Sequence, residues 1–162
     1  MKLNKLFLML TFLVLLGTTA FAQVTWYVNN QIGNDGRNGL SATIPTPDDG
    51  VTGPKKTIGG PQGAIASSNP GDVIVVVYTG TDYGTLTGEP ATITVDKQLT
   101  FQSTGGTVGI SSIFEVATGA LANKAIFNSG AFNLKGGLTL TSGTLDNPSG
   151  LVTVSGGTVT VA

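Results

Sequence analysis

The sequence predicts an all-β solenoid, a fold in which each coil of the chain contributes about three short strands. From Gly105 onward, short segments of apolar residues and threonine alternate with glycine, and the chain holds 24 glycines in 162 residues. Charged residues make up 10% of the chain, compared with roughly a quarter of an average soluble domain. Segments this short are atypical of β-sandwiches, whose strands average about five to six residues, and are typical of stacked repeats.

The N-terminal end has the pattern of a cleaved secretory signal peptide, which we assign to residues 1–22. Lys2 and Lys5 form a basic region, residues 6–16 form an apolar region, and Ala20 to Ala22 match an A-x-A cleavage site. As a helix, the apolar region would cover about 16 Å of the roughly 30 Å hydrocarbon core of a bilayer, so a membrane anchor is the weaker alternative. We therefore expect an exported protein, secreted or at the cell surface, with no membrane span after cleavage.

Composition excludes several classes of function. The chain contains no cysteine and no histidine, which rules out disulfides, thiolate metal sites and histidine-based catalysis. The formal net charge is -1 and no basic run is present, so nucleic acid is not an expected partner. An exported protein without cysteine has to obtain its stability from repeated hydrogen bonding and side-chain stacking.

The chain after the leader begins with strand and turn signals. Residues 23–29 alternate between two faces and predict a strand, and residues 29–53 are rich in turn residues. Thr57 is the expected N-cap of a short helix over residues 62–67. Three residues are expected to form the buried face of this helix: Ile58, Ala64 and Ile65. The continuous apolar run from Val73 to Tyr78 predicts a strand that is at least partly buried on both faces.

Later strands are predicted from alternation and from glycine punctuation. The predicted segments are 91–95, 98–102, 108–110, 113–116, 125–127, 131–134, 138–140, 143–145, 151–154 and 158–161. Residues 136–143 and 155–161 echo each other, as successive turns of a solenoid would. We divide the chain into the signal peptide (1–22), an N-terminal cap with the first coils (23–104) and Gly/Thr-rich repeats (105–162), which we expect to continue beyond Ala162.

A series of short motifs follows in order between Thr25 and Gly106. They are Trp26-Tyr27-Val28, Gly33-Asn34-Asp35, Gly39-Leu40-Ser41, Pro54 to Ile58, Ala64-Ile65, Pro70-Gly71-Asp72, Gly80 to Tyr83 and Val95 to Phe101. This order resembles the N-terminal region of secreted right-handed parallel β-helix proteins of the pectate-lyase-like class. The resemblance implies a right-handed parallel β-helix whose first coil is covered by a strand and a short capping helix. Lys55 departs from the family pattern, in which an aromatic residue is common at this position.

Asn34, Asp35 and Asn38 are the candidate ligands of a calcium ion. They lie in a glycine-rich loop, and carboxylate and amide oxygens are the hard ligands that Ca²⁺ prefers. The alternative is that each side chain caps its own turn by accepting backbone hydrogen bonds. Asp48 and Asp49 form a second acidic pair on a Pro/Gly-rich loop, where the alternatives are a calcium ion and a solvated turn.

Trp26 and Tyr83 are the candidate carbohydrate-binding residues, because aromatic rings stack on the apolar faces of sugars. Packing in the core or the cap is the alternative for both. Enzymes of the pectate-lyase class use acidic residues to hold Ca²⁺ and a lysine or arginine as base, and we nominate no catalytic residue here. The part of the chain after Gln98 holds four scattered charges: Glu115, Lys124, Lys135 and Asp146.

These observations favour an extracellular or cell-surface structural or adhesion module without its own catalytic site. The alternative is the N-terminal part of a carbohydrate-active β-helix enzyme, a polysaccharide lyase or hydrolase. A surface-binding solenoid with threonine ladders is a third interpretation. The expected partner is an extracellular polysaccharide or a cell surface, the expected cofactor is none or Ca²⁺, and an open C-terminal coil would favour self-association.

Overall fold

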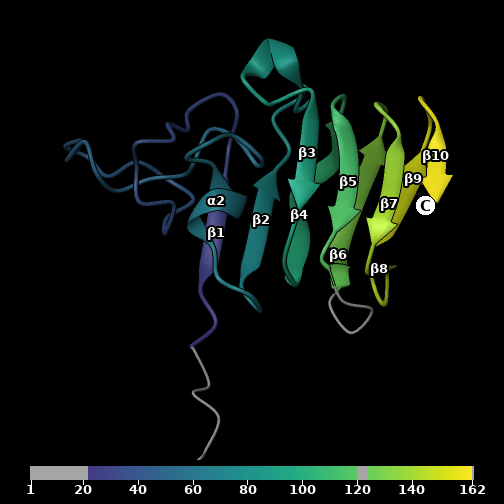
Figure 1. Ribbon diagram of the computed structural model, residues 1–162. Coiled ribbons are helices and arrows are strands. Elements are labelled where there is room, and N and C mark those ends of the chain that lie inside the picture. The colour runs from purple at the N-terminus through teal and green to yellow at the C-terminus, as the bar shows by residue number, and fades with distance from the viewer. Residues whose placement is uncertain (1–21, 120–123, 162) are drawn as a thin grey trace, which may run out of the picture.

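The computed structural model describes residues 22–119 and 124–161, which form a parallel β-solenoid of about four turns (Figure 1). The predicted leader therefore lies outside the described residues except for Ala22. The elements are β1 (Thr25–Val28), α2 (Ala64–Ser67), β2 (Val73–Val77), the 3₁₀ turn η1 (Thr85–Thr87), β3 (Thr92–Val95), β4 (Leu99–Ile110), β5 (Ile113–Ala117), β6 (Lys124–Leu134), β7 (Leu138–Ser142), β8 (Thr144–Asp146), β9 (Leu151–Val154) and β10 (Val159–Val161).

The strands lie in two hydrogen-bonded sheets, in which every pair is parallel. One sheet has the order β1-β2-β4-β6-β8, with β9 also paired to β6, and the other has the order β10-β7-β5-β3. Neighbours in each sheet come from successive turns of the chain, which is the defining feature of a solenoid. The predicted all-β solenoid is thereby confirmed.

Bends within β4 and β6 give two successive turns of the chain a third wall, beside the two that the sheets form. β4 bends at Gly105 and Gly106, whose φ angles are 84° and 157°, and β6 bends near Gly130, whose φ is 76°. The register between β4 and β6 shifts at these bends, and segments predicted as separate strands merge into β4 and β6. Beyond the bends, residues 107–110 pair with 131–134, which pair with β9. We call these three segments the third wall.

The core fills the space inside the turns and is built from aligned apolar side chains. Ile74, Phe101 and Phe127 occupy paired positions in three successive turns, and all three are fully buried. The rings of Phe101 and Phe127 stack with centroids 5.3 Å apart, and Phe114 meets Phe101 edge-on at 5.5 Å. Val73 to Val76 are buried, as expected of a strand covered on both faces.

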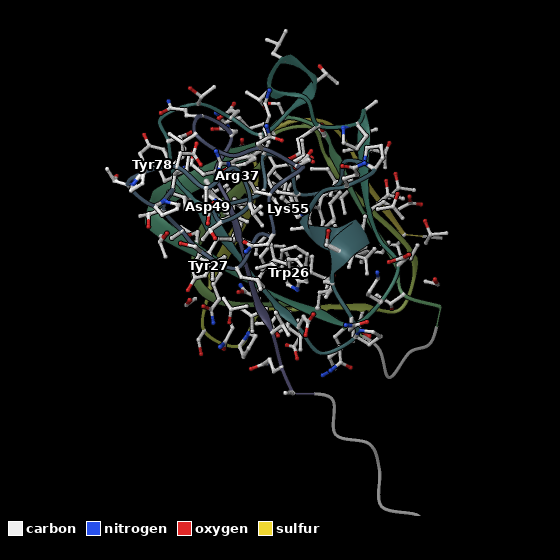
Figure 2. All side chains as sticks on the ribbon, turned by 90° about the vertical axis from the view of Figure 1, so that its left-hand side faces the viewer. Trp26, Tyr27, Arg37, Asp49, Lys55 and Tyr78 are labelled. Carbon is white, nitrogen blue, oxygen red and sulfur yellow. The ribbon has the colours of Figure 1, made fainter. Side chains whose placement is uncertain are left out.

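The N-terminal end of the solenoid is covered by the loop that follows β1 and by α2 (Figures 1 and 2). Three residues predicted to form the helix's buried face are buried, namely Ile58, Ala64 and Ile65. α2 itself is a single turn, shorter than the predicted 62–67, because Gly59, Gly60 and Pro61 precede it.

The predicted N-cap is wrong. Gly63 occupies that position without a side-chain hydrogen bond. The Thr57 hydroxyl instead donates to Asp35 at 2.7 Å and accepts the backbone N–H of Gly60 at 3.1 Å. The Thr57 side chain therefore fixes the loop before the helix, while the backbone carbonyls of Thr57 and Ile58 accept the N–H groups of Ala64 and Ile65 in the first turn of α2. No helix in the described residues is both long and apolar enough to cross a membrane.

Replacing Gly130 with alanine is expected to destabilise the fold by about 1–3 kcal/mol. The φ of 76° is strained for a residue with a Cβ, and the added Cβ would collide with the Ser103 hydroxyl and carbonyl oxygens. Urea unfolding followed by circular dichroism measures the change. Gly71→Ala is the matched control, because Gly71 has a φ of 94° with nothing within 4 Å of the added Cβ. Equal losses in the two variants would show that the close approach of neighbouring turns is unimportant.

Candidate functional site

The three candidate calcium ligands lie in one loop, where each side chain accepts backbone hydrogen bonds. Asn34 accepts the N–H of Gly36 at 2.8 Å, and Asn38 accepts that of Leu40 at 3.0 Å. One Asp35 oxygen accepts the N–H groups of Lys56 and Thr57, and the other accepts the Thr57 hydroxyl. These contacts stabilise turns and join the loop to the segment before α2. Calcium binding stays a prediction.

Acidic side chains elsewhere in the loop have similar roles. Arg37 donates to both oxygens of Asp48, at 2.9 and 2.7 Å, and this contact lowers the pKa of Asp48 to about 2. Asp49 accepts the N–H groups of Val51 and Thr52. Within residues 22–119 and 124–161, no group of three or more acidic, histidine or cysteine side chains is placed to hold a metal ion.

The two candidate sugar-stacking residues lie in different surroundings. Trp26 is half-buried, its indole N–H donates to Asp72 at 2.9 Å, and its ring lies against Gly39. Tyr83 is only 1% exposed and donates its hydroxyl to the Val77 carbonyl at 2.8 Å, so its ring is not accessible to a sugar in this structure. Figure 2 shows Trp26 near the middle of the N-terminal end and Tyr78 at the periphery.

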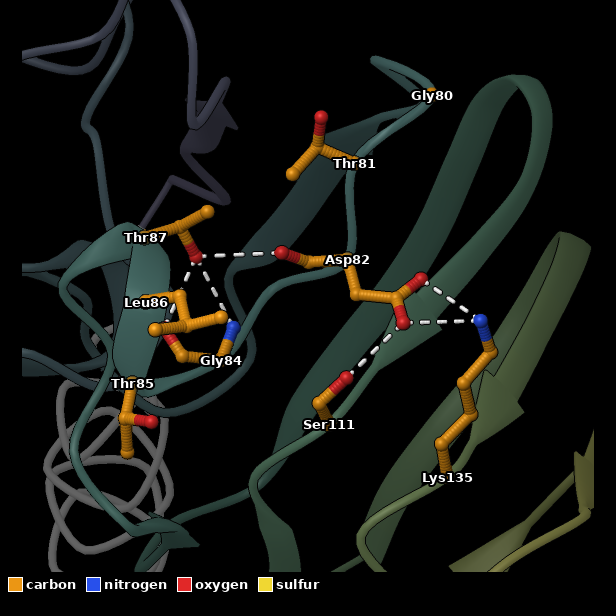
Figure 3. A pocket seen from close by; sticks show the side chains of 9 residues that line it. All are labelled: Gly80, Thr81, Asp82, Gly84, Thr85, Leu86, Thr87, Ser111 and Lys135. Carbon is orange, nitrogen blue, oxygen red and sulfur yellow. Dashed lines mark hydrogen bonds and ion pairs between the residues drawn. The ribbon is translucent and has the colours of Figure 1, made fainter.

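A groove lies between the loop after β2 and the third wall (Figure 3). It consists of a hollow of about 490 Å³ and an adjoining hollow of about 250 Å³, which share three lining residues. The shared residues are Gly80, Asp82 and Lys135, the first hollow adds Thr81, Gly84, Thr85, Leu86, Thr87 and Ser111, and the second adds Tyr78, Thr107, Gly109 and Asn133.

Strand register places the groove's floor on the outward face of the third wall. Tyr83 forms a parallel bridge with Ile110, so the loop after β2 adds a further rung to this wall. Gly109 pairs with Asn133, and Asn133 pairs with Thr153 in the next turn. Because side chains alternate along a strand, the buried Ile110 and its partners face the core and this polar row faces out.

An ion pair lies at the centre of the groove. Lys135 donates to both carboxylate oxygens of Asp82 at 2.9 Å, and the Ser111 hydroxyl donates to the same carboxylate at 3.0 Å. The hydrogen bond from Lys135 holds the pKa of Asp82 below its usual value. Gly109 makes room for this arrangement, since a Cβ there would overlap the Asp82 carboxylate.

The groove offers hydrogen bonding rather than an activated nucleophile. Ser111 is the hydroxyl nearest to a base, but that base is a carboxylate whose pKa is lowered, and such a group accepts a proton poorly. Tyr78, which lines the second hollow, is 46% exposed, and Leu86, which lines the first, is fully exposed. The groove therefore combines hydroxyl, amide and aromatic contacts on an accessible surface.

Comparison with protein-family models, curated proteins and solved structures returns no match to this chain. The fold is therefore established by the structure, and the pectate-lyase-like resemblance rests on the motifs between Thr25 and Gly106.

Proposed function

We propose that the protein is an exported, non-enzymatic β-solenoid module that acts outside the cell or at its surface, in a structural or adhesive role, and binds extracellular polysaccharide. The observation that supports this most directly is the groove. Its lining consists mainly of hydroxyl, amide and backbone groups, includes the exposed Tyr78 and contains no activated nucleophile. In ligand sites, convergent polar groups fix the orientation of the ligand and provide specificity.

A polymer suits the third wall better than a single small molecule does. Gly109, Asn133 and Thr153 repeat the same outward position in three successive turns, which are about 4.8 Å apart in a parallel ladder. A polysaccharide likewise repeats its hydroxyl groups along its length. Several weak contacts made at once give useful affinity, as in other multivalent binding.

The alternative function is that of the N-terminal part of a carbohydrate-active enzyme. Lys135 in the groove favours it, because lyases of the resembling class use a lysine or arginine as base. The Lys135 ammonium group, however, donates to both oxygens of Asp82, and a base has to be free of its proton. We therefore favour polysaccharide binding over catalysis as the function of the groove.

Replacing Tyr78 with alanine is expected to weaken polysaccharide binding about threefold to tenfold, the range that one aromatic contact supplies. The measurement is native affinity electrophoresis of the purified full chain through gels containing neutral or acidic polysaccharides. Ile113→Ala is the control, since Ile113 is 41% exposed on β5 and lines neither hollow. If no polysaccharide in the panel retards the unaltered protein, the proposed function is wrong.

A further inference from the structure

We propose that the groove is specific for uncharged polysaccharide chains and discriminates against acidic ones. This inference rests on the proposed function and specifies its ligand class. It is drawn from the balance of charge in the groove, where one carboxylate and one ammonium group neutralise each other at 2.9 Å (Figure 3). The other lining residues of both hollows are neutral.

The one cationic side chain that an acidic sugar could bind in the groove is already paired with a carboxylate. Lys135 is the only positively charged residue among those that line the groove, and both oxygens of Asp82 already accept its protons. A ligand carboxylate that approached Lys135 would lie beside the Asp82 carboxylate, and like charges at such distances repel. Displacing Asp82 from Lys135 would also leave its charge unpaired.

A neutral hydroxyl group meets no such barrier. An ammonium group has three donors, and two of those of Lys135 point at Asp82, which leaves a third for a sugar oxygen. The Asp82 carboxylate has about four acceptor positions and takes three hydrogen bonds from Lys135 and Ser111. The ion pair therefore serves a sugar hydroxyl as donor and as acceptor without adding net charge.

Neutral contacts continue along the wall on the next turns. Asn133 lines the second hollow, and the Ser155 hydroxyl donates to its side-chain oxygen at 2.6 Å, which holds the amide in place. Thr153 occupies the paired position one turn further. Within the described residues, the groove thus presents a polar surface whose only charges compensate each other.

The test compares the purified full chain on a neutral panel (β-glucan, xylan, galactomannan) and an acidic panel (alginate, polygalacturonate, carboxymethyl cellulose) at low and high salt. We expect retention by at least one neutral polysaccharide, with a salt effect below about twofold, because exposed charges are screened but neutral contacts are not. Asp82→Asn leaves Lys135 uncompensated, so this variant should gain about twofold to fivefold in affinity for acidic polysaccharides at low salt.

A double variant, Asp82→Asn with Lys135→Met, restores neutrality and should not show this gain. Circular dichroism of each variant checks folding, and the salt dependence of the unaltered protein tests the inference without any substitution. Stronger, salt-sensitive binding of the unaltered protein to the acidic panel would overturn the neutral class and leave the proposed function standing. If folded Asp82→Asn shows the same preference between the two panels as the unaltered protein, the inferred neutral ligand class is also overturned. If neither panel retains the unaltered protein, the proposed function itself is overturned.

Discussion

Replacing Phe127 with alanine is expected to lower the free energy of unfolding by about 3–5 kcal/mol, the range for deleting a buried aromatic side chain. Phe127 is fully buried, and its ring centroid lies 5.3 Å from that of Phe101, 5.5 Å from that of Phe114 and 4.9 Å from that of Phe132. Its loss would leave a cavity between two successive turns, where the hydrogen-bonded strands limit collapse. Urea unfolding followed by far-ultraviolet circular dichroism measures the change.

The control for this variant is Leu86→Ala, which removes an apolar side chain that is fully exposed at the tip of η1. It should change the free energy of unfolding by less than about 0.5 kcal/mol. A loss below about 1 kcal/mol for Phe127→Ala would mean that the ring is not closely packed between its neighbours. A shift in the transition with an unchanged slope would show that the cooperative unit is preserved.

Strands could be predicted from the sequence because alternation assigns faces directly. In β3, Ile93 and Val95 are buried whereas Thr94 is exposed, as the alternation requires. The sequence similarity between residues 136–143 and 155–161 also corresponds to strand pairing, since Leu138 pairs with Val159 and Leu140 with Val161 in successive turns. The length of α2 was harder to predict, because two glycines and a proline oppose a helix that the apolar spacing favours.

The groove could not be predicted, because it depends on the register between turns. Asp82 and Lys135 are 53 residues apart, and nothing local in either segment indicates the other. Their alignment depends on the bends near Gly106 and Gly130, which set how much chain each turn consumes. Asp82 could be placed only on a loop, and Lys135 only after a strand.

The segment before α2 shows a second arrangement that register creates. Four successive backbone N–H groups, those of residues 56–59, donate to two carboxylates. Asp35 accepts the first two, and Glu89, which comes from the far side of η1, accepts the last two. Glu89 is only 4% exposed, and burial raises its pKa to about 7. The nearby Asp35 carboxylate acts in the same direction, and Glu89 in turn adds to the raised pKa of Tyr83.

This pKa implies that stability falls as the pH rises. Between about pH 4.5 and 7 the folded chain keeps a proton on Glu89 that the unfolded chain has lost, so the free energy of unfolding decreases through this window and is constant above it. We expect a decrease of about 2–3 kcal/mol between pH 5 and 8. Urea titrations across that range measure it. The pKa values of Asp48 and Asp82 are lowered in the fold, so these two carboxylates affect stability only below this range, where their protonation by acid reduces the free energy of unfolding.

Glu89→Gln should abolish the decrease, because an amide keeps an acceptor for the backbone at residues 58 and 59 and carries no charge at any pH. One of the two backbone hydrogen bonds is lost in this variant, which costs about 1 kcal/mol at every pH. At pH 8 the variant should therefore still equal or exceed the unaltered protein in stability. Glu115→Gln, which alters a carboxylate on β5 bound by the hydroxyls of Thr94 and Thr141, should retain the decrease. A flat profile in the unaltered protein, or the same slope in Glu89→Gln, would show that Glu89 is ionised in the fold and that its two N–H contacts outweigh its burial.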